Sequence, residues 1–190
     1  MARELQRIVI PALFAHFSSP PLRDRLRTIY AWGHSFEQWF KWEAVAALEP
    51  IVCPMKGDPW DPNQWHLEYR KHQRKLGVLD MALLGTRPLF LHFKVFVPWA
   101  FNWGWIVGRE NCLLNDITKA REFRDAAAAT LLLFMAHPGK EIDLRQEGVP
   151  PPDNPRAPKI SLGTVAYYPD LRPIAARGVY AQLLCWTNSR

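Results

Sequence analysis

Two short apolar segments, residues 78–84 and 89–97, are separated by only four residues in this chain of 190. Each has the length of a buried β-strand, and the intervening Gly85–Pro88 is typical of a turn. The pattern predicts a β-hairpin in the core. The first strand would carry Asp80 into that core and the second Lys94. Because burying an unpaired charge is costly, both residues need partners, which constrains the fold and the candidate site together.

The segments around the hairpin favour an α/β fold. Apolar residues at helical spacing predict a helix from Phe36 to Glu49, with Ser35 as its cap and Pro50 as its end. Further elements are predicted from spacing, length and turn residues. They are N-terminal helices over 5–17, broken by Pro11, and 22–32, a strand over 65–70, a helix over 111–129, a buried strand over 130–136, and a closing strand pair over 165–168 and 179–186.

This order of elements resembles the core of the PD-(D/E)xK nucleases, which has a helix, a hairpin with an aspartate and then a lysine, a second helix and a buried strand. The resemblance spans about residues 35–136. It implies a restriction-endonuclease-like mixed β-sheet flanked by helices. Extra N-terminal helices and a C-terminal strand extension over about 159–190 would complete a single domain, residues 1–190.

Matched to the family motif, Asp80 takes the position of the strand aspartate and Lys94 that of the lysine. Glu37 resembles the helical glutamate, with Glu43 as second choice. The resemblance implies that Glu37, Asp80 and Lys94 are catalytic, with the lysine near the attacking water. It also implies Mg²⁺ or Mn²⁺ as cofactor, since hard divalent cations prefer oxygen ligands.

The chain departs from the family motif at His92, two residues before the lysine, where the family has an acid or another oxygen donor. Side chains two apart on a strand face the same side, so His92 is expected beside Lys94 and becomes the third expected metal ligand with Glu37 and Asp80. Imidazole is a poor ligand for Mg²⁺ and a better one for softer metals. Three outcomes follow: a changed metal preference, weak activity from the two carboxylates alone, or a retained fold without catalysis.

Two shorter motifs also resemble the family. Glu68-Tyr69 corresponds to a Glu-Tyr strand that often precedes the aspartate, and Asp116-x-x-Lys119 to the opening of the helix after the lysine strand. The plainer interpretation of Asp116 and Lys119 is a solvated helix start.

Structural roles remain open for the site residues themselves. Asp80 and Lys94 could pair with each other, or Asp80 with an arginine. Glu37 could do no more than interact with the helix macrodipole, and His92 could be a hydrogen-bonded core histidine.

The composition favours an anionic partner. The formal net charge is +6 and the basic residues cluster, for example at Arg23, Arg25 and Arg27 and again over 70–75. A basic surface attracts phosphate backbones, so nucleic acid is the expected partner, and the resemblance to the nucleases implies DNA. A protein partner or a homodimer stays open. No apolar run is long enough to cross a membrane, and no leader sequence is recognisable, so no membrane partner and a cytoplasmic location are expected.

The sequence thus predicts a divalent-metal-dependent DNA nuclease, from defence or mobile-element biology. The alternative from another class is a catalytically inactive protein of the same fold that binds nucleic acid or a protein partner. A third interpretation is an interaction protein of unrelated α/β fold, which would lack the hairpin over 78–97.

Overall fold

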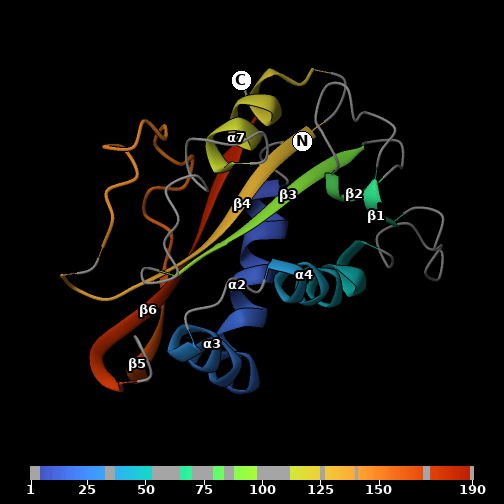
Figure 1. The fold of residues 1–190 in the computed structure, drawn as a ribbon. Helices are drawn as coiled ribbons and strands as arrows, with labels where there is room; N and C mark the ends of the chain where they lie inside the picture. Colours follow the sequence, from blue (N-terminus) through green and yellow to red (C-terminus); the bar gives the residue numbers. More distant parts are fainter. Residues whose placement is uncertain are drawn as a thin grey trace.

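The computed structural model describes residues 5–32, 37–52, 65–69, 79–83, 88–97, 112–124, 127–139, 141–168 and 172–188. Within these ranges six strands form one mixed sheet in the order β1-β2-β3-β4-β6-β5 (Figure 1). The strands are β1 (Trp65–Tyr69), β2 (Leu79–Leu83), β3 (Leu89–Phe96), β4 (Ala127–Ala136), β5 (Lys159–Tyr167) and β6 (Ile174–Thr187). Neighbouring strands are antiparallel except β3 and β4, which run parallel.

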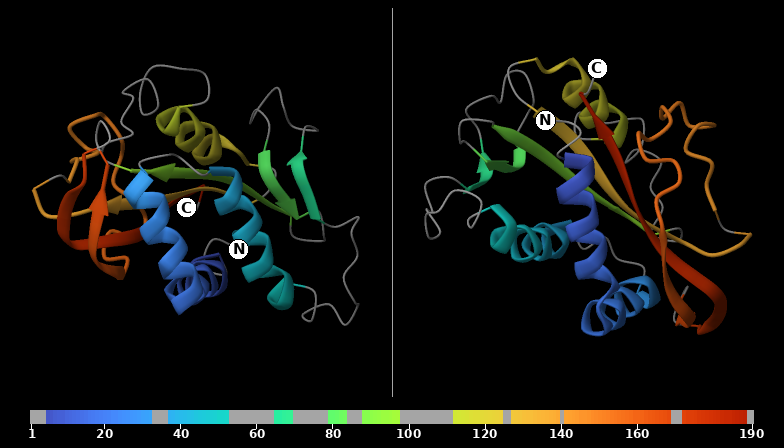
Figure 2. Two further views of the ribbon diagram at one scale, coloured as in Figure 1. Left: turned by 60° about the horizontal axis from the view of Figure 1, so that its bottom comes forward. Right: turned by 180° about the vertical axis from the view of Figure 1, so that it is seen from behind.

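Helices cover both faces of this sheet. They are the π-helix η1 (Leu5–Val9) and the α-helices α2 (Ile10–Ser18), α3 (Pro20–Trp32), α4 (Glu37–Val52) and α7 (Leu113–Glu122). Figure 2 shows α2, α3 and α4 on one side of the sheet and α7 on the other. The predicted α/β class, a mixed sheet with flanking helices, is confirmed. No helix in the described part of the chain is long and apolar enough to cross a lipid bilayer.

Alternation along β3 divides the core into two layers. Leu91, Phe93 and Val95 belong to the large apolar cluster formed with α2, α3 and α4. Phe96 packs with α7 on the other face, and Phe90 contacts the end of that helix through Phe123. Because successive residues of a strand face opposite sides, His92 and Lys94 share the α7 face of the sheet.

The hairpin and the helix before it were predicted correctly in type, but the end of that helix was not. β2 and β3 pair as an antiparallel hairpin, as expected. Helix α4 continues through Pro50 to Val52, although Pro50 was predicted to end it. A proline this near the end of a helix removes one late backbone hydrogen bond and leaves the earlier turns intact. Ser35 lies outside the described residues.

The alanine run at the start of β4, residues 127–129, was predicted wrongly. Residues 127–129 were expected to end the second helix, whereas α7 ends at Glu122 and these alanines are the first residues of β4. They pair with Leu89, Phe90 and Leu91 of β3. Alanine has a high helix propensity, but pairing inside a buried sheet outweighs that local preference.

The N-terminal helices also differ from the prediction at their starts. Pro11 lies in the first turn of α2, and α3 begins at Pro20 instead of Leu22. Proline is accepted in a first turn because the N–H that it lacks would have no helical partner there.

Residues 149–158 contain no helix or strand, and they complete the sheet at a point that β5 does not reach. The β5 ladder starts at the pair Lys159↔Gln182, so residues beyond Gln182 on β6 need other partners. Asn154 supplies them: its side chain donates to the Leu183 carbonyl at 2.9 Å and accepts from the Cys185 N–H at 2.8 Å.

Replacing Asn154 with alanine is therefore expected to lower the free energy of unfolding by about 1–3 kcal/mol, because two β6 backbone groups lose their partners. Urea denaturation followed by tryptophan fluorescence measures the change. The matched control is Gln146→Ala, at an exposed position in the same connecting region. Equal stability of the Asn154 variant and the wild type would show that the hydrogen bonds from Asn154 to the β6 backbone do not stabilise the fold.

Candidate functional site

The candidate site lies where β2 separates from β3. The two strands pair from Leu83↔Leu89 to Met81↔Leu91, and β2 then continues beside β1 alone. Asp80 is the first residue beyond the shared ladder. Its carboxylate takes over a ladder position by accepting a hydrogen bond of 2.6 Å from the Phe93 N–H. The separation of the strands therefore fixes Asp80 against the backbone of the lysine strand.

Four ion pairs connect this point to helices on both faces of the sheet. The Lys41 ammonium lies 2.7 Å from Asp80 and 3.8 Å from Glu37, both measured from Nζ to the carboxylate oxygen. The Lys94 ammonium lies 3.5 Å from Glu37 and 3.2 Å from Asp116. Glu37 and Lys41 come from α4, and Asp116 comes from α7. We call these five side chains, Glu37, Lys41, Asp80, Lys94 and Asp116, the charged cluster.

The structure thus brings together the three residues expected to be catalytic. Glu37 and Lys94 pair directly, and Lys41 links Glu37 to Asp80. The prediction that Asp80 and Lys94 need buried partners is confirmed, since each is less than a tenth exposed and each has an ion pair.

For two members of the charged cluster, Lys41 and Asp116, the sequence did not predict a place in the site. Lys41 was not singled out from the sequence. Asp116 was given a solvated helix start as its plainer interpretation, which is wrong because Asp116 is only 4% exposed. Lys119 is partly exposed, so the solvated helix start remains consistent with Lys119 although it fails for Asp116. Glu43, the second choice for the helical glutamate, pairs with His16 and Arg25 instead.

Burial and neighbouring charges shift the pKa values of two members of the charged cluster, Lys94 and Glu37. Desolvation opposes the charged form of Lys94, but Asp116, Glu37 and Asp80 outweigh it, and the pKa of Lys94 is raised. Lys94 therefore stays an ammonium at neutral pH. Desolvation raises the pKa of Glu37, an effect that Asp80 reinforces and that Lys94 and Lys41 partly offset. Lys94 is suited to hold and neutralise an anion, and poorly suited to remove a proton.

His92 lies beside the charged cluster without a partner for its Nε2 atom. The side chain is 4% exposed, and Nε2 has no hydrogen-bond partner among the described residues. Desolvation lowers the pKa of His92 despite the nearby Asp116 and Asp80, so the imidazole is neutral at neutral pH. His92 is therefore a buried core histidine whose Nε2 atom makes no hydrogen bond within the described residues.

Replacing His92 with phenylalanine is expected to preserve or raise the free energy of unfolding, by up to about 1 kcal/mol. The substitution keeps an aromatic ring and removes a buried polar atom that lacks a partner. Chemical denaturation compares the variant with the wild type. A loss of more than about 2 kcal/mol would mean that His92 makes a hydrogen bond essential to the fold.

No family model, no curated protein and no solved structure matches this chain.

The implied metal ligands Glu37, Asp80 and His92 do not form a metal site as they stand. Among the described residues, no three His, Cys, Asp or Glu side chains cluster closely enough to hold an ion. The carboxylates are the donors that Mg²⁺ or Mn²⁺ prefers. The position beside Asp80 is, however, already taken by the Lys41 ammonium, so a metal ion would have to displace Lys41.

Some sequence features lie outside the described residues, among them the basic cluster over 70–75. The side chains of Glu68 and Tyr69 are likewise not described; their strand β1 pairs with β2.

Proposed function

We propose that the chain is a divalent-metal-dependent DNA nuclease of the PD-(D/E)xK type, from defence or mobile-element biology, with a restriction-endonuclease-like core. One observation carries the proposal: Glu37, Asp80 and Lys94 meet where β2 leaves β3. The order of elements supports it, with a helix, three strands, a helix and a strand in α4-β1-β2-β3-α7-β4. Ion pairs that served only to stabilise the fold would not require the helices and strands to follow one another in this order.

Each residue has a role in the proposed reaction. Lys94, held by Asp116 and Glu37, presents a buried positive charge that would hold a phosphate oxygen. The Phe93 N–H orients the Asp80 carboxylate, so Asp80 is a fixed point of negative charge. A divalent cation bound there would polarise the phosphate and lower the pKa of a bound water. The side chains named here would orient the phosphate and the cation. The Lys41 ammonium would have to move away from Asp80 to make room for the cation.

The direct experiment is a cleavage assay on linear, supercoiled and single-stranded DNA with Mg²⁺, with Mn²⁺ and with EDTA. Metal-dependent cleavage by the wild type that is lost on substitution of Lys94 with methionine supports the proposal. Absence of cleavage with every substrate and both metals contradicts it. Cleavage that is unaffected by EDTA would contradict the metal requirement.

A second function is favoured by the contact between Lys41 and Asp80. An ammonium 2.7 Å from the carboxylate supplies the positive charge that a metal would otherwise supply. With His92 in place of an acid, the chain would be a catalytically inactive member of the fold that binds nucleic acid or a protein partner. Retained DNA binding in EDTA by a protein that cleaves nothing would favour this second function.

A further inference from the structure

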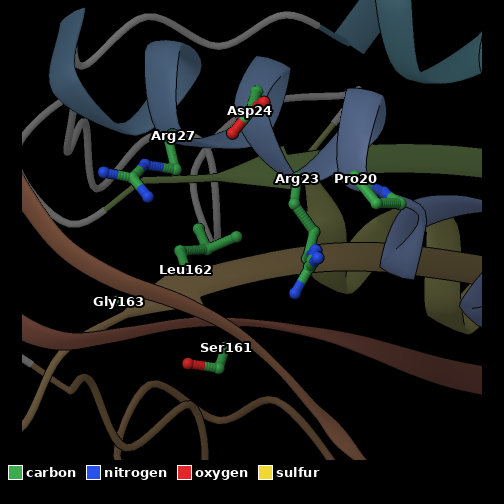
Figure 3. Close-up of a pocket in the computed structure, with 7 residues that line it drawn as sticks. All are labelled: Pro20, Arg23, Asp24, Arg27, Ser161, Leu162 and Gly163. Atoms are coloured by element: carbon green, nitrogen blue, oxygen red, sulfur yellow. The ribbon is translucent and has the colours of Figure 1, made fainter.

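A pocket of about 320 Å³ opens between the start of α3 and the edge strand β5, on the part of the sheet farthest from β2. Figure 3 shows the side chain of Arg23 reaching from α3 toward β5, with Arg27 one turn farther along the helix. The strand contributes Ser161, Leu162 and Gly163 to the lining. Three strand spacings separate β5 from β3, or about 14 Å, so this pocket is distinct from the charged cluster.

The pocket has a surplus of positive charge and of free donors. Two guanidinium groups, of Arg23 and Arg27, face one carboxylate, of Asp24. Arg27 donates one hydrogen bond to the Thr164 carbonyl at 3.2 Å, and Arg23 pairs with no side chain in the described part of the chain. The helix end adds little, because Pro20 and its neighbour Pro21 have no N–H. The arginines are therefore the groups that would hold an anion here.

A bulge in β5 keeps the strand side of the pocket open. The β5–β6 register shifts on both sides of Gly163, which has a φ of 68°. A side chain at that φ would be strained, and a Cβ built at Gly163 would meet no atom within 4 Å. The bulge thus leaves open space opposite the arginines.

The same seam ends in an exposed aromatic pair. Helix α3 and strand β5 run side by side, joined first by Arg27 and Thr164 and then by the Tyr168 N–H, which donates to the Ala31 carbonyl at 3.2 Å. Beyond that bond, the rings of Trp32 and Tyr168 lie 5.8 Å apart and are 60% and 47% exposed, taking each residue as a whole. Because both residues are largely exposed, much of their ring surface is left out of core packing at the end of the helix and strand that carry the pocket.

We propose that this α3/β5 seam binds single-stranded nucleic acid, with phosphates at Arg23 and Arg27 and a base stacked on Trp32. Arginine forks match phosphate oxygens, and aromatic faces accept any base. The proposal rests on nucleic acid as the partner in the proposed function, and it does not require catalysis. A strand held here would lie along the edge of the sheet opposite β1.

Fluorescence anisotropy with a labelled oligothymidylate of about twenty nucleotides, in EDTA, tests the proposal on the full chain. The double variant R23Q/R27Q is expected to bind at least about tenfold more weakly at low salt. Its log–log salt dependence should be shallower by about 1.4, because two phosphate contacts are lost. The variant W32A should bind about tenfold more weakly with an unchanged salt slope, since stacking is uncharged.

The control is R145Q, which removes one positive charge, against two in R23Q/R27Q, from an exposed arginine in the segment that packs on the α7 face through Leu144. It should bind within about twofold of the wild type. The proposal is overturned if R23Q/R27Q binds like the wild type, if R145Q loses as much affinity as R23Q/R27Q, or if W32A has no effect. Because the assay in EDTA measures binding without cleavage, failure of the wild type to cleave DNA concerns the charged cluster alone. Failure of R23Q/R27Q to weaken binding concerns the seam alone.

Discussion

Replacing Asp80 with asparagine is expected to reduce DNA cleavage by at least about a hundredfold in both Mg²⁺ and Mn²⁺. Asparagine has nearly the same size and can still accept the Phe93 N–H, so the geometry of the strand separation should survive. What disappears is the negative charge between Lys41 and the lysine strand. The measurement is the initial rate of cleavage of the best DNA substrate.

Two controls separate lost chemistry from lost structure. The first is Asp143→Asn, which removes a carboxylate that pairs with the exposed Arg145 and with no member of the charged cluster, and which should cleave at the wild-type rate. The second is circular dichroism with a melting curve, because the asparagine leaves the buried Lys41 ammonium without its nearest counter-charge. Wild-type cleavage by a folded Asp80→Asn protein would place the active site elsewhere or remove it.

The convergence of Asp80 and Lys94 could be predicted because the sequence encodes it locally. The two strands are close in sequence and apolar apart from Asp80, His92 and Lys94, so their pairing needs only a short turn. Continuing the observed register, Asp80 would lie opposite His92, and alternation then places Lys94 on the same face. Period-two alternation thus settled which residues share a face before any tertiary contact was known.

Lys41 was missed although a signal for it exists. It lies four residues after Glu37 on a correctly predicted helix, and side chains at that spacing are neighbours on the helix surface. What the spacing does not encode is where α4 crosses the sheet. That crossing brings Lys41 to Asp80 on a strand almost forty residues away in the chain, and it depends on long-range packing such as Phe40 against Phe93.

Asp116 and the alanines of β4 illustrate the same limit. A polar residue in a first helical turn is usually solvated, and an alanine run usually continues a helix. Both expectations fail because α7 crosses between two parallel neighbours, β3 and β4. The crossover puts the start of α7 over Lys94 and starts the next strand early. Local helix propensity decides the structure of a segment only where pairing within a buried sheet does not stabilise another conformation more.

Replacing Lys41 with methionine is expected to make the stability of the protein depend on Mn²⁺. In the wild type, three carboxylates and two ammonium groups give the charged cluster a formal charge of −1. Methionine fills much of the space of the lysine stem, changes the charge to −2, and leaves Asp80 buried without its counter-ion. Without metal, the variant should lose about 3 kcal/mol of stability.

Mn²⁺ should restore most of that loss by occupying the place of the ammonium. A ligand that binds only the folded state at a hundred times its dissociation constant stabilises by about 2.7 kcal/mol, or roughly 5–10 °C in melting temperature for a chain of this size. Thermal melts of Lys41→Met and of the charge-preserving control Lys41→Arg, with and without Mn²⁺, measure the effect. The arginine variant should melt at one temperature in both conditions.

The melting results distinguish the two functions of the charged cluster. If only Lys41→Met responds to Mn²⁺, Glu37 and Asp80 can hold a metal and Lys41 competes with it, so a cleaving wild type must move Lys41 aside. If the methionine variant does not respond, the carboxylates fail to hold an ion even when freed. The charged cluster then stabilises the fold alone, as the catalytically inactive alternative requires. An equal response of wild type and variant would contradict competition by Lys41, because its ammonium would not be in the way.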